Sequence, residues 1–169
     1  MSDQLLKEFA EQIQDAVQAK KLLRITGSGS KDWLGGELKG TALSTKDYQG
    51  VVSYQPDELV ITVKAGTSVK EVESILAEKN QQFSFESPHF GANATIGGMV
   101  GAGLAGPGRV SAGNLRDFVL GAKIMDGQAQ IMNFGGTVMK NVAGYDVSRL
   151  MPGSFGTLGL LLDVSIKVL

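Results

Sequence analysis

The stretch Thr95-Ile96-Gly97-Gly98-Met99-Val100-Gly101-Ala102-Gly103-Leu104-Ala105-Gly106-Pro107-Gly108 decides how this chain folds. Glycine occupies six of its fourteen positions, although glycine loses more conformational entropy on folding than any other residue. Such a density predicts that the backbone comes very close to a neighbouring group. Apolar residues lie between the glycines, which excludes a flexible Gly/Ser linker. We expect a buried turn pressed against a flat or phosphorylated ligand.

Two further glycine clusters accompany this stretch, Gly27-Ser28-Gly29-Ser30 and Gly135-Gly136. The first follows a predicted short strand, residues 22–26, and continues into Lys31. A strand that ends in glycine and serine exposes backbone N–H groups and hydroxyls, which suit phosphate oxygens. The same residues also make an ordinary surface loop, and the local sequence leaves both interpretations open.

The composition excludes several classes of protein. The 169 residues, 43% of them hydrophobic, are enough for one domain or two small lobes with a core. A net charge of −1 gives no basis for binding nucleic acid or an anionic membrane. The chain has no cysteine and one histidine, so it lacks the residues for disulfides, cysteine-ligated iron–sulfur clusters and multi-histidine metal sites. We expect no metal site and no transmembrane segment, and a cytoplasmic location or a peripheral one at the inner membrane through partners.

Hydrophobic periodicity and turn residues predict a chain of short strands with few helices. Helices are expected over residues 3–20, after Ser68, where Glu71 completes a capping box, and over residues 147–151. Asp126-Gly127 is expected to form a hairpin turn. The expected strands cover residues 22–26, 41–44, 51–54, 59–66, 117–125, 129–134 and 158–169.

Residues 101–106 match the dinucleotide-binding pattern G-x-G-x-x-G, but their context argues against that motif. The pattern must follow a strand and open a helix. Here Gly97-Gly98 interrupts the preceding run, and Pro107 follows the third glycine and would break a helix. The flanking segments are also mostly β rather than β-α-β, so we reject the Rossmann interpretation.

A few polar residues have two interpretations each. His89 is a candidate general base or flavin attachment point, although a lone histidine in an aromatic loop is more often structural. Lys140 and Asn141 suit a phosphate or a cofactor ring, or else a solvated loop. Asp146 and Arg149, three residues apart, indicate a surface ion pair.

Taken in order along the chain, these motifs resemble the FAD-binding domain of the vanillyl-alcohol-oxidase type. More narrowly, they resemble the FAD-binding subunits of bacterial glycolate oxidases. The resemblance covers about residues 22–169, and the segment Gly135–Asp146 is its most specific part. The motifs are Gly27-Ser28-Gly29-Ser30, Pro88-His89-Phe90, Thr95-Ile96-Gly97-Gly98, Gly103-Leu104-Ala105-Gly106-Pro107, Leu115–Gly121, Gly135–Asp146 and Gly153–Gly159.

The resemblance implies a two-lobed α+β domain of the PCMH type over residues 1–169. A small, mostly parallel βα lobe is expected over about residues 1–47. A larger mixed or antiparallel sheet flanked by helices is expected over about residues 48–169, with FAD extended between the lobes. The sequence ends after the last predicted strand, so we expect the C-terminal substrate (cap) domain of such relatives to be absent from it.

The resemblance also implies which residues bind FAD, but no catalytic residue. The first loop would cradle the pyrophosphate, residues 95–98 would contact pyrophosphate and flavin, and residues 156–160 would lie near the adenine. Many relatives carry a longer glycine run in the first loop, so hydroxyls are expected to take part here. The implied cofactor-binding residues are Gly27, Ser28, Gly29, Ser30, Lys31, Thr95, Ile96, Gly97, Gly98, Gly101, Lys140, Asn141, Gly144, Tyr145, Gly156, Leu158 and Leu160.

The implied function is an FAD-binding module of a complex that oxidises glycolate to glyoxylate. FAD would take a hydride from the small 2-hydroxy acid and pass electrons to partner subunits, a second FAD subunit and an iron–sulfur subunit. Two alternatives remain open. The chain could be a non-catalytic assembly subunit that keeps the fold without flavin, or a fragment of a stand-alone FAD-dependent hydroxy-acid dehydrogenase.

Overall fold

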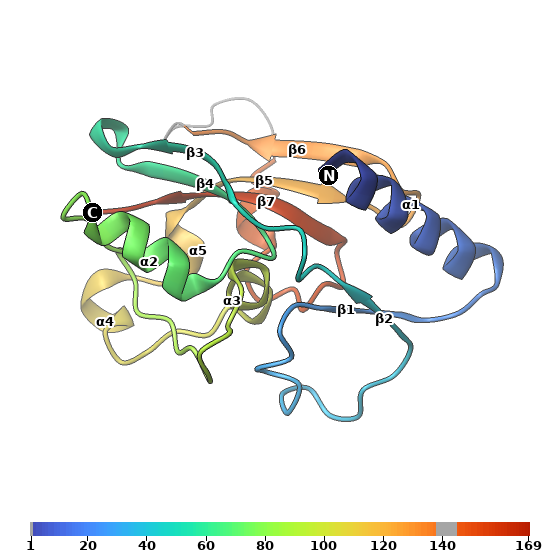
Figure 1. The fold of residues 1–169 in the computed structure, drawn as a ribbon. Helices are drawn as coiled ribbons and strands as arrows, with labels where there is room; N and C mark the ends of the chain where they lie inside the picture. The colour runs from blue at the N-terminus through green and yellow to red at the C-terminus, as the bar shows by residue number, and fades with distance from the viewer. Residues whose placement is uncertain (1, 138–144) are drawn as a thin grey trace.

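The computed structural model describes residues 2–137 and 145–169. Helices, two of them short 3₁₀ turns, alternate irregularly with strands, giving an α+β chain (Figure 1). The elements in order are α1 Ser2–Gln18, β1 Leu23–Thr26, β2 Thr41–Ser44, β3 Val51–Gln55, η1 Pro56–Glu58, β4 Val60–Lys64, α2 Val69–Ala77, α3 Ile96–Ala102, α4 Arg109–Ala112, α5 Leu115–Phe118, β5 Val119–Met125, β6 Ile131–Gly135, η2 Ser148–Leu150 and β7 Leu160–Lys167.

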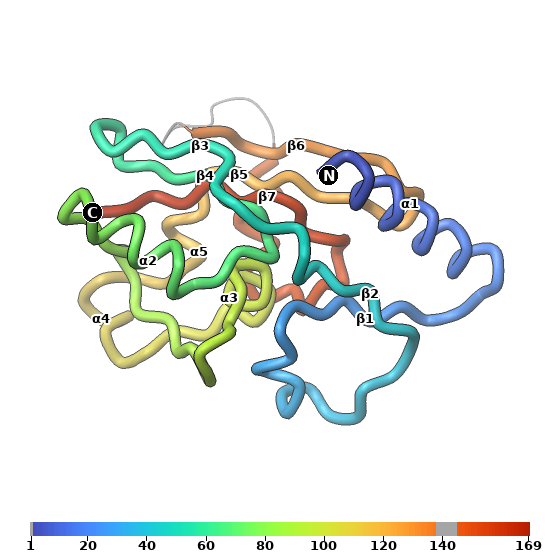
Figure 2. The backbone as a smooth tube through the Cα atoms, in the orientation of Figure 1, coloured from blue at the N-terminus to red at the C-terminus, as the bar shows by residue number. Residues whose placement is uncertain are grey.

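The strands form two sheets of different kinds. Strands β1 and β2 pair in parallel, with Leu23 opposite Thr41. The larger sheet has the order β3-β4-β7-β5-β6, and every neighbouring pair in it is antiparallel. Figure 2 shows the long connection from β1 to β2 looping away from the rest of the chain. The predicted fold class, a small parallel sheet beside a larger antiparallel one, is confirmed.

Helices cover both faces of the larger sheet (Figure 1). On one face, α2, α3 and α5 bury Leu76, Ile96 and Leu115 against β4, β5 and β7. On the other face, Phe9 and Ile13 of α1 pack against a separate cluster that includes Leu162 of the larger sheet. The same cluster includes Leu43 of β2, so α1 joins the two sheets instead of covering the small sheet alone. The expected lobe boundary near residue 47 stays a prediction.

The central glycine stretch begins as a helix, so the predicted buried turn is wrong for residues 96–102. The Thr95 hydroxyl caps this helix by accepting a hydrogen bond from the Gly98 N–H at 3.2 Å. The Gly97 N–H donates to the Ala65 carbonyl at 2.7 Å, which ties the first turn to the end of β4. Gly103, at φ +60°, ends the helix. These tertiary contacts outweigh the low helix propensity of glycine.

The later glycines of the stretch approach protein rather than ligand. A Cβ atom on Gly106 would overlap the Glu86 carboxylate, and one on Gly108 would lie 3.0 Å from its Oε2. The Gly108 N–H donates to that same oxygen at 2.7 Å, and the Gly106 N–H donates to the Glu86 carbonyl at 3.0 Å. The chain therefore wraps around Glu86, and the glycines at these two positions make that close approach possible.

Two local predictions at helix starts are corrected. The expected capping box of α2 is absent, because Ser68 makes no side-chain cap. The Val69 N–H donates instead to the Ala94 carbonyl at 2.8 Å. The strand expected from residue 117 starts at Val119, after the single turn of α5. There the Asp117 carboxylate accepts a hydrogen bond from the Asn114 N–H at 2.9 Å.

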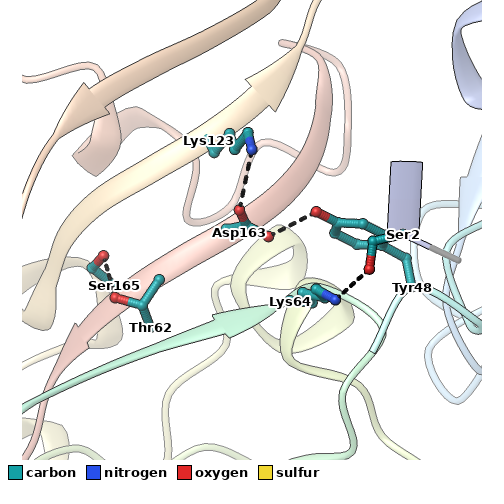
Figure 3. A network of polar contacts seen from close by, with 7 residues as sticks. All are labelled: Ser2, Tyr48, Thr62, Lys64, Lys123, Asp163 and Ser165. Atoms are coloured by element: carbon teal, nitrogen blue, oxygen red, sulfur yellow. Dashed lines mark hydrogen bonds and ion pairs between the residues drawn. The ribbon is translucent and has the colours of Figure 1, made fainter. Parts of the chain in front are cut away.

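A polar network lies on the sheet face beside α1 (Figure 3). The Tyr48 hydroxyl donates to Asp163 Oδ1 at 3.1 Å, and Lys123 Nζ lies 3.7 Å from Asp163 Oδ2. Burial and the adjacent Asp163 carboxylate raise the pKa of Tyr48 above its ordinary value. Lys64 Nζ donates to the Ser2 hydroxyl at 2.7 Å and so ties the first turn of α1 to β4. None of the helices in the described part of the chain combines the length and apolar character needed to span a membrane.

Candidate cofactor site

A cavity of about 410 Å³ lies where the loop after β1 meets α3 and the turn before β7. This volume is within the range of about 300–1,000 Å³ typical of small-molecule sites. Its walls come from three segments far apart in the sequence. They are Arg24–Asp32, Leu34, Gly35, Leu38 and Thr45 around the small sheet, Ala65, Thr95, Gly97, Gly98, Gly101 and Ala102 around α3, and Met151, Ser154, Phe155, Gly156, Gly159 and Leu161 near β7.

The structure brings most of the sequence-predicted site residues together around this cavity. The predicted residues that line the cavity come from the whole first loop, from the start and middle of α3, and from the turn before β7. These are Gly27, Ser28, Gly29, Ser30, Lys31, Thr95, Gly97, Gly98, Gly101 and Gly156. Their binding role stays a prediction, but their shared location is what a single ligand site requires.

Other predicted residues lie elsewhere. Ile96, the first residue of α3, is fully buried in the core, and Tyr145 is 92% exposed outside the cavity. Leu158 and the buried Leu160 line a neighbouring cavity of about 580 Å³, whose wall shares Gly156 with the first. The predictions for Lys140, Asn141 and Gly144 lie outside the described residues.

The first loop, residues 27–31, lines the cavity with hydrogen-bond donors that have no partner in the described protein. Among the described residues, no acceptor pairs with its backbone N–H groups or with the hydroxyls of Ser28 and Ser30. The Asp32 N–H closes the loop by donating to the Gly29 carbonyl at 3.1 Å. Successive backbone N–H groups without a protein partner are a common feature of anion sites.

The start of α3 contributes space rather than donors. The Ile96 N–H donates to the Thr67 carbonyl at 2.9 Å, the Gly97 N–H to Ala65, and the Gly98 N–H to Thr95. These N–H groups are therefore already satisfied within the protein. An anion in the cavity would take its hydrogen bonds from the first loop, and α3 would form the opposite wall.

Gly101 opens this wall to a ligand. A Cβ atom on Gly101 would meet nothing within 4 Å, although the residue lines the cavity. At Gly97 the opposite holds, since a Cβ atom there would lie 2.8 Å from the Ala65 Cβ. Gly97 thus allows α3 to pack against the end of β4, whereas Gly101 leaves space in the cavity.

The charged side chains of the described lining are Arg24, Lys31 and Asp32. Arg24 Nη1 pairs with Asp32 Oδ2 at 3.4 Å. Lys31 Nζ is buried and has no hydrogen-bond partner among the described residues, and burial lowers the pKa of Lys31. Sequence reasoning missed Arg24 and Asp32, since neither belongs to the glycine motif. Their eight-residue separation across the loop gave no local signal.

His89 does not take part in the cavity. Its Nε2 lies 3.0 Å from Glu73 Oε1 on α2, and it is not among the lining residues. This contact agrees with the structural interpretation of His89 rather than with a general base at this site. The predicted surface pair of Asp146 and Arg149 is confirmed, with Nε and Oδ2 at 3.3 Å.

Comparison with solved structures supports the architecture. The chain superposes on a solved structure of alkyldihydroxyacetonephosphate synthase with a TM-score of 0.73 at 18% sequence identity. The match covers 96% of this chain and 30% of that one. At this identity the likeness concerns the fold alone, and it agrees with the PCMH-type arrangement of the two sheets.

Curated relatives are similar over most of the chain. Glycolate oxidase subunit GlcE of Escherichia coli (strain K12) is 50% identical over 159 residues, which cover 94% of this chain and 45% of that protein. Glycolate oxidase subunit GlcD of Bacillus subtilis (strain 168) is 30% identical over 129 residues, covering 76% and 27%. D-2-hydroxyglutarate dehydrogenase of Xanthomonas citri pv. viticola is 27% identical over 141 residues, covering 83% and 29%.

The chain spans less than half the length of these curated relatives. A domain family also matches most of the chain. The family described as "FAD binding domain" matches residues 6–135, which include the first loop and all of α3. FAD is the cofactor that this family implies, and the unused donors of the first loop fit its diphosphate. The chain therefore belongs to the FAD binding domain family of flavoproteins.

Proposed function

We propose that this chain is the FAD-binding module of a glycolate-oxidase-type complex, which oxidises glycolate or a similar 2-hydroxy acid. The supporting similarity is 50% identity to a protein named as a glycolate oxidase subunit. The observation that carries the proposal is that residues 27–31, whose donors have no partner in the described protein, line a cavity of about 410 Å³. When bound, FAD supplies the ring that accepts a hydride from such substrates.

In this proposal the first loop binds the diphosphate of FAD. Its N–H groups and the hydroxyls of Ser28 and Ser30 donate to the phosphate oxygens, and the absence of a Cβ at Gly101 leaves room for the cofactor. The serines replace part of the longer glycine run of many relatives. They add hydroxyl donors at the positions where those relatives rely on backbone alone.

The proposed role is cofactor binding, with substrate oxidation completed by other parts of the complex. The described lining holds no histidine or glutamate, and its one carboxylate, Asp32, is paired with Arg24. A base for the substrate hydroxyl is therefore expected from another segment or subunit. The chain also has no cysteine, so an iron–sulfur cluster would need ligands from a partner. We accordingly propose a second FAD subunit and an iron–sulfur subunit as partners.

Absorption spectroscopy of the purified chain tests this proposal. FAD is added, the excess is removed by desalting, and the visible flavin band is measured beforehand and afterwards. Trp33 is the single tryptophan of the chain and lies on the connection from β1 to β2, so its fluorescence provides a second readout. We expect a retained flavin band and quenched Trp33 emission. A colourless protein with unchanged emission would contradict cofactor binding by this chain and favour the assembly-subunit alternative.

A further inference from the structure

We propose that the Lys31 ammonium group is the charged anchor of the FAD diphosphate, and that the ring of Phe90 holds it in position. The inference rests on the proposed function, because it names the charged contact that the cofactor makes in the same cavity. It also assigns a role to Phe90, which lies outside the first loop. A loop of neutral donors alone would give the diphosphate hydrogen bonds but no compensating positive charge.

Lys31 is a cation without a protein counter-ion in the described structure. Its Nζ is buried from solvent and makes no hydrogen bond with the described residues. The nearest acidic residue in the sequence, Asp32, pairs instead with Arg24 at 3.4 Å. A buried ammonium group that lacks a partner is costly, so its presence in a cavity wall indicates that a ligand supplies the negative charge.

Phe90 lies beside that charge, although it is not itself one of the residues that line the cavity. Lys31 Nζ lies 5.9 Å from the centroid of the Phe90 ring, within the range of a cation–π contact. Phe90 in turn packs edge to face against Trp33, with ring centroids 5.2 Å apart. Phe90 also adopts a positive φ of 50°, which is uncommon for an aromatic residue. The ammonium group is thus held against a ring that comes from a separate segment of the chain.

The surroundings of Lys31 favour a phosphate over a carboxylate. Lys31 ends the loop that lines the cavity and whose other N–H groups and serine hydroxyls have no partner in the described protein. Such a dense set of donors matches several phosphate oxygens, whereas the carboxylate of a small acid has only two oxygens. Both a phosphate and a carboxylate would offer an anionic oxygen to Lys31. Titrations with ADP and with glycolate distinguish these two ligands.

Calorimetric titration of the full 169-residue chain with FAD, ADP and glycolate tests the inference. ADP carries the diphosphate without the flavin, and glycolate carries a carboxylate without phosphate. The variants are Lys31→Met, which keeps the stem, and Lys31→Arg, which keeps the charge. Lys70→Met on the exposed surface of α2 is the matched control for losing one positive charge.

We expect Lys31→Met to weaken binding of both FAD and ADP by roughly 10- to 100-fold, as for the loss of a hydrogen bond to a charged group. Lys31→Arg should recover part of that loss, and Lys70→Met should bind both ligands as the unaltered chain does. Added salt should weaken FAD binding to the unaltered chain more than to Lys31→Met.

Phe90→Leu tests the positioning role separately. It should weaken FAD binding by a smaller factor than Lys31→Met and also reduce its salt dependence, whereas Phe90→Tyr should restore both. A purely structural role for Phe90 would lower stability without changing the salt dependence.

Several outcomes would overturn the inference. One is equal FAD and ADP affinities in Lys31→Met and the unaltered chain. Another is a loss for FAD without a loss for ADP, which would place Lys31 on the flavin side. A third is Lys31-dependent binding of glycolate alone. If the unaltered chain binds ADP through Lys31 but fails to bind FAD, the proposed function fails while the diphosphate contact stands.

Discussion

Gly27 and Thr95 meet at the edge of the cavity, and the Thr95 side chain leaves no room for a Cβ atom at position 27. A Cβ atom on Gly27 would overlap the Thr95 hydroxyl oxygen. That same oxygen caps α3 by accepting the Gly98 N–H. The end of β1 and the start of α3 are therefore packed directly together, so the first loop and α3 line the same cavity.

Replacing Gly27 by alanine should disturb both elements at once. The added methyl group must displace the Thr95 side chain from its cap, so we expect the free energy of unfolding to fall by about 1–3 kcal/mol. FAD binding should weaken in parallel. Chemical denaturation and FAD titration measure the two effects. Gly127→Ala is the control, because a Cβ atom there meets nothing within 4 Å and its change should stay within about 0.5 kcal/mol.

Gly101→Ala should separate stability from cofactor binding. Gly101 lies in α3 with open space above it, so alanine should stabilise the cofactor-free protein by about 0.5–1 kcal/mol through its better helix propensity. The same methyl group projects into the cavity and should weaken FAD binding. Thermal unfolding without FAD and calorimetric titration with FAD give the two readouts. Unchanged FAD affinity would mean that the cofactor does not pass over Gly101.

Gly97→Ala, in the same helix, should destabilise the protein where Gly101→Ala stabilises it. Its methyl group would lie 2.8 Å from the Ala65 Cβ, so α3 must shift away from the end of β4. We expect a loss of about 1–3 kcal/mol in the free energy of unfolding despite the gain in helix propensity. Urea denaturation of this variant beside Gly101→Ala tests it, and a stabilised Gly97→Ala protein would contradict the packing described here.

Thr95→Val should remove the cap of α3 while keeping the size of the side chain. The Gly98 N–H then loses its acceptor, and we expect a cost of about 0.5–2 kcal/mol in chemical denaturation. Ser68→Ala is a matched comparison at the start of α2, where the side chain makes no cap. Its effect should stay within about 0.5 kcal/mol. Equal losses in both variants would argue against the Thr95 cap.

Tyr48→Phe should change the stability of the protein at high pH. The pKa of Tyr48 is raised in the folded state, so folding favours the protonated phenol. Its contribution is fully present below the ordinary pKa of 10.0 and is lost as the pH rises above it, because the unfolded chain then ionises and the folded one does not. The phenylalanine variant should lack this part of the alkaline loss.

Urea denaturation across this pH range, with the tyrosinate absorption band as a second readout, measures the effect. Near neutral pH the same variant should lose roughly 1–3 kcal/mol, since Asp163 keeps Lys123 but no longer receives the Tyr48 hydroxyl. Identical alkaline profiles for the two proteins would show that Tyr48 ionises freely in the folded state.

Much of the fold could be predicted from local sequence because its signals are local. The alternation in residues 59–66 and the Asp126-Gly127 turn predicted β4 and the β5–β6 hairpin, and the apolar repeat of residues 3–20 predicted α1. Local rules failed at α2 and α5. The start of α2 depends on a hydrogen bond from the Val69 N–H to the Ala94 carbonyl, which is distant in sequence. The single turn of α5 lies where a strand was expected.

The sequence by itself determined most of the strands and the first loop, since strand alternation and the Gly-Ser run need no distant partner to be recognised. The grouping of these strands into two sheets was implied by the family resemblance and not by the local pattern. Only the tertiary structure decided what each glycine of the central stretch does. Gly97 packs on Ala65, Gly106 and Gly108 wrap around Glu86, and Gly101 leaves space in the cavity. Contacts between residues far apart in the chain carry no local pattern. For the same reason only the folded chain shows that α3 has its N–H groups satisfied and that Lys31 lies buried without a described partner.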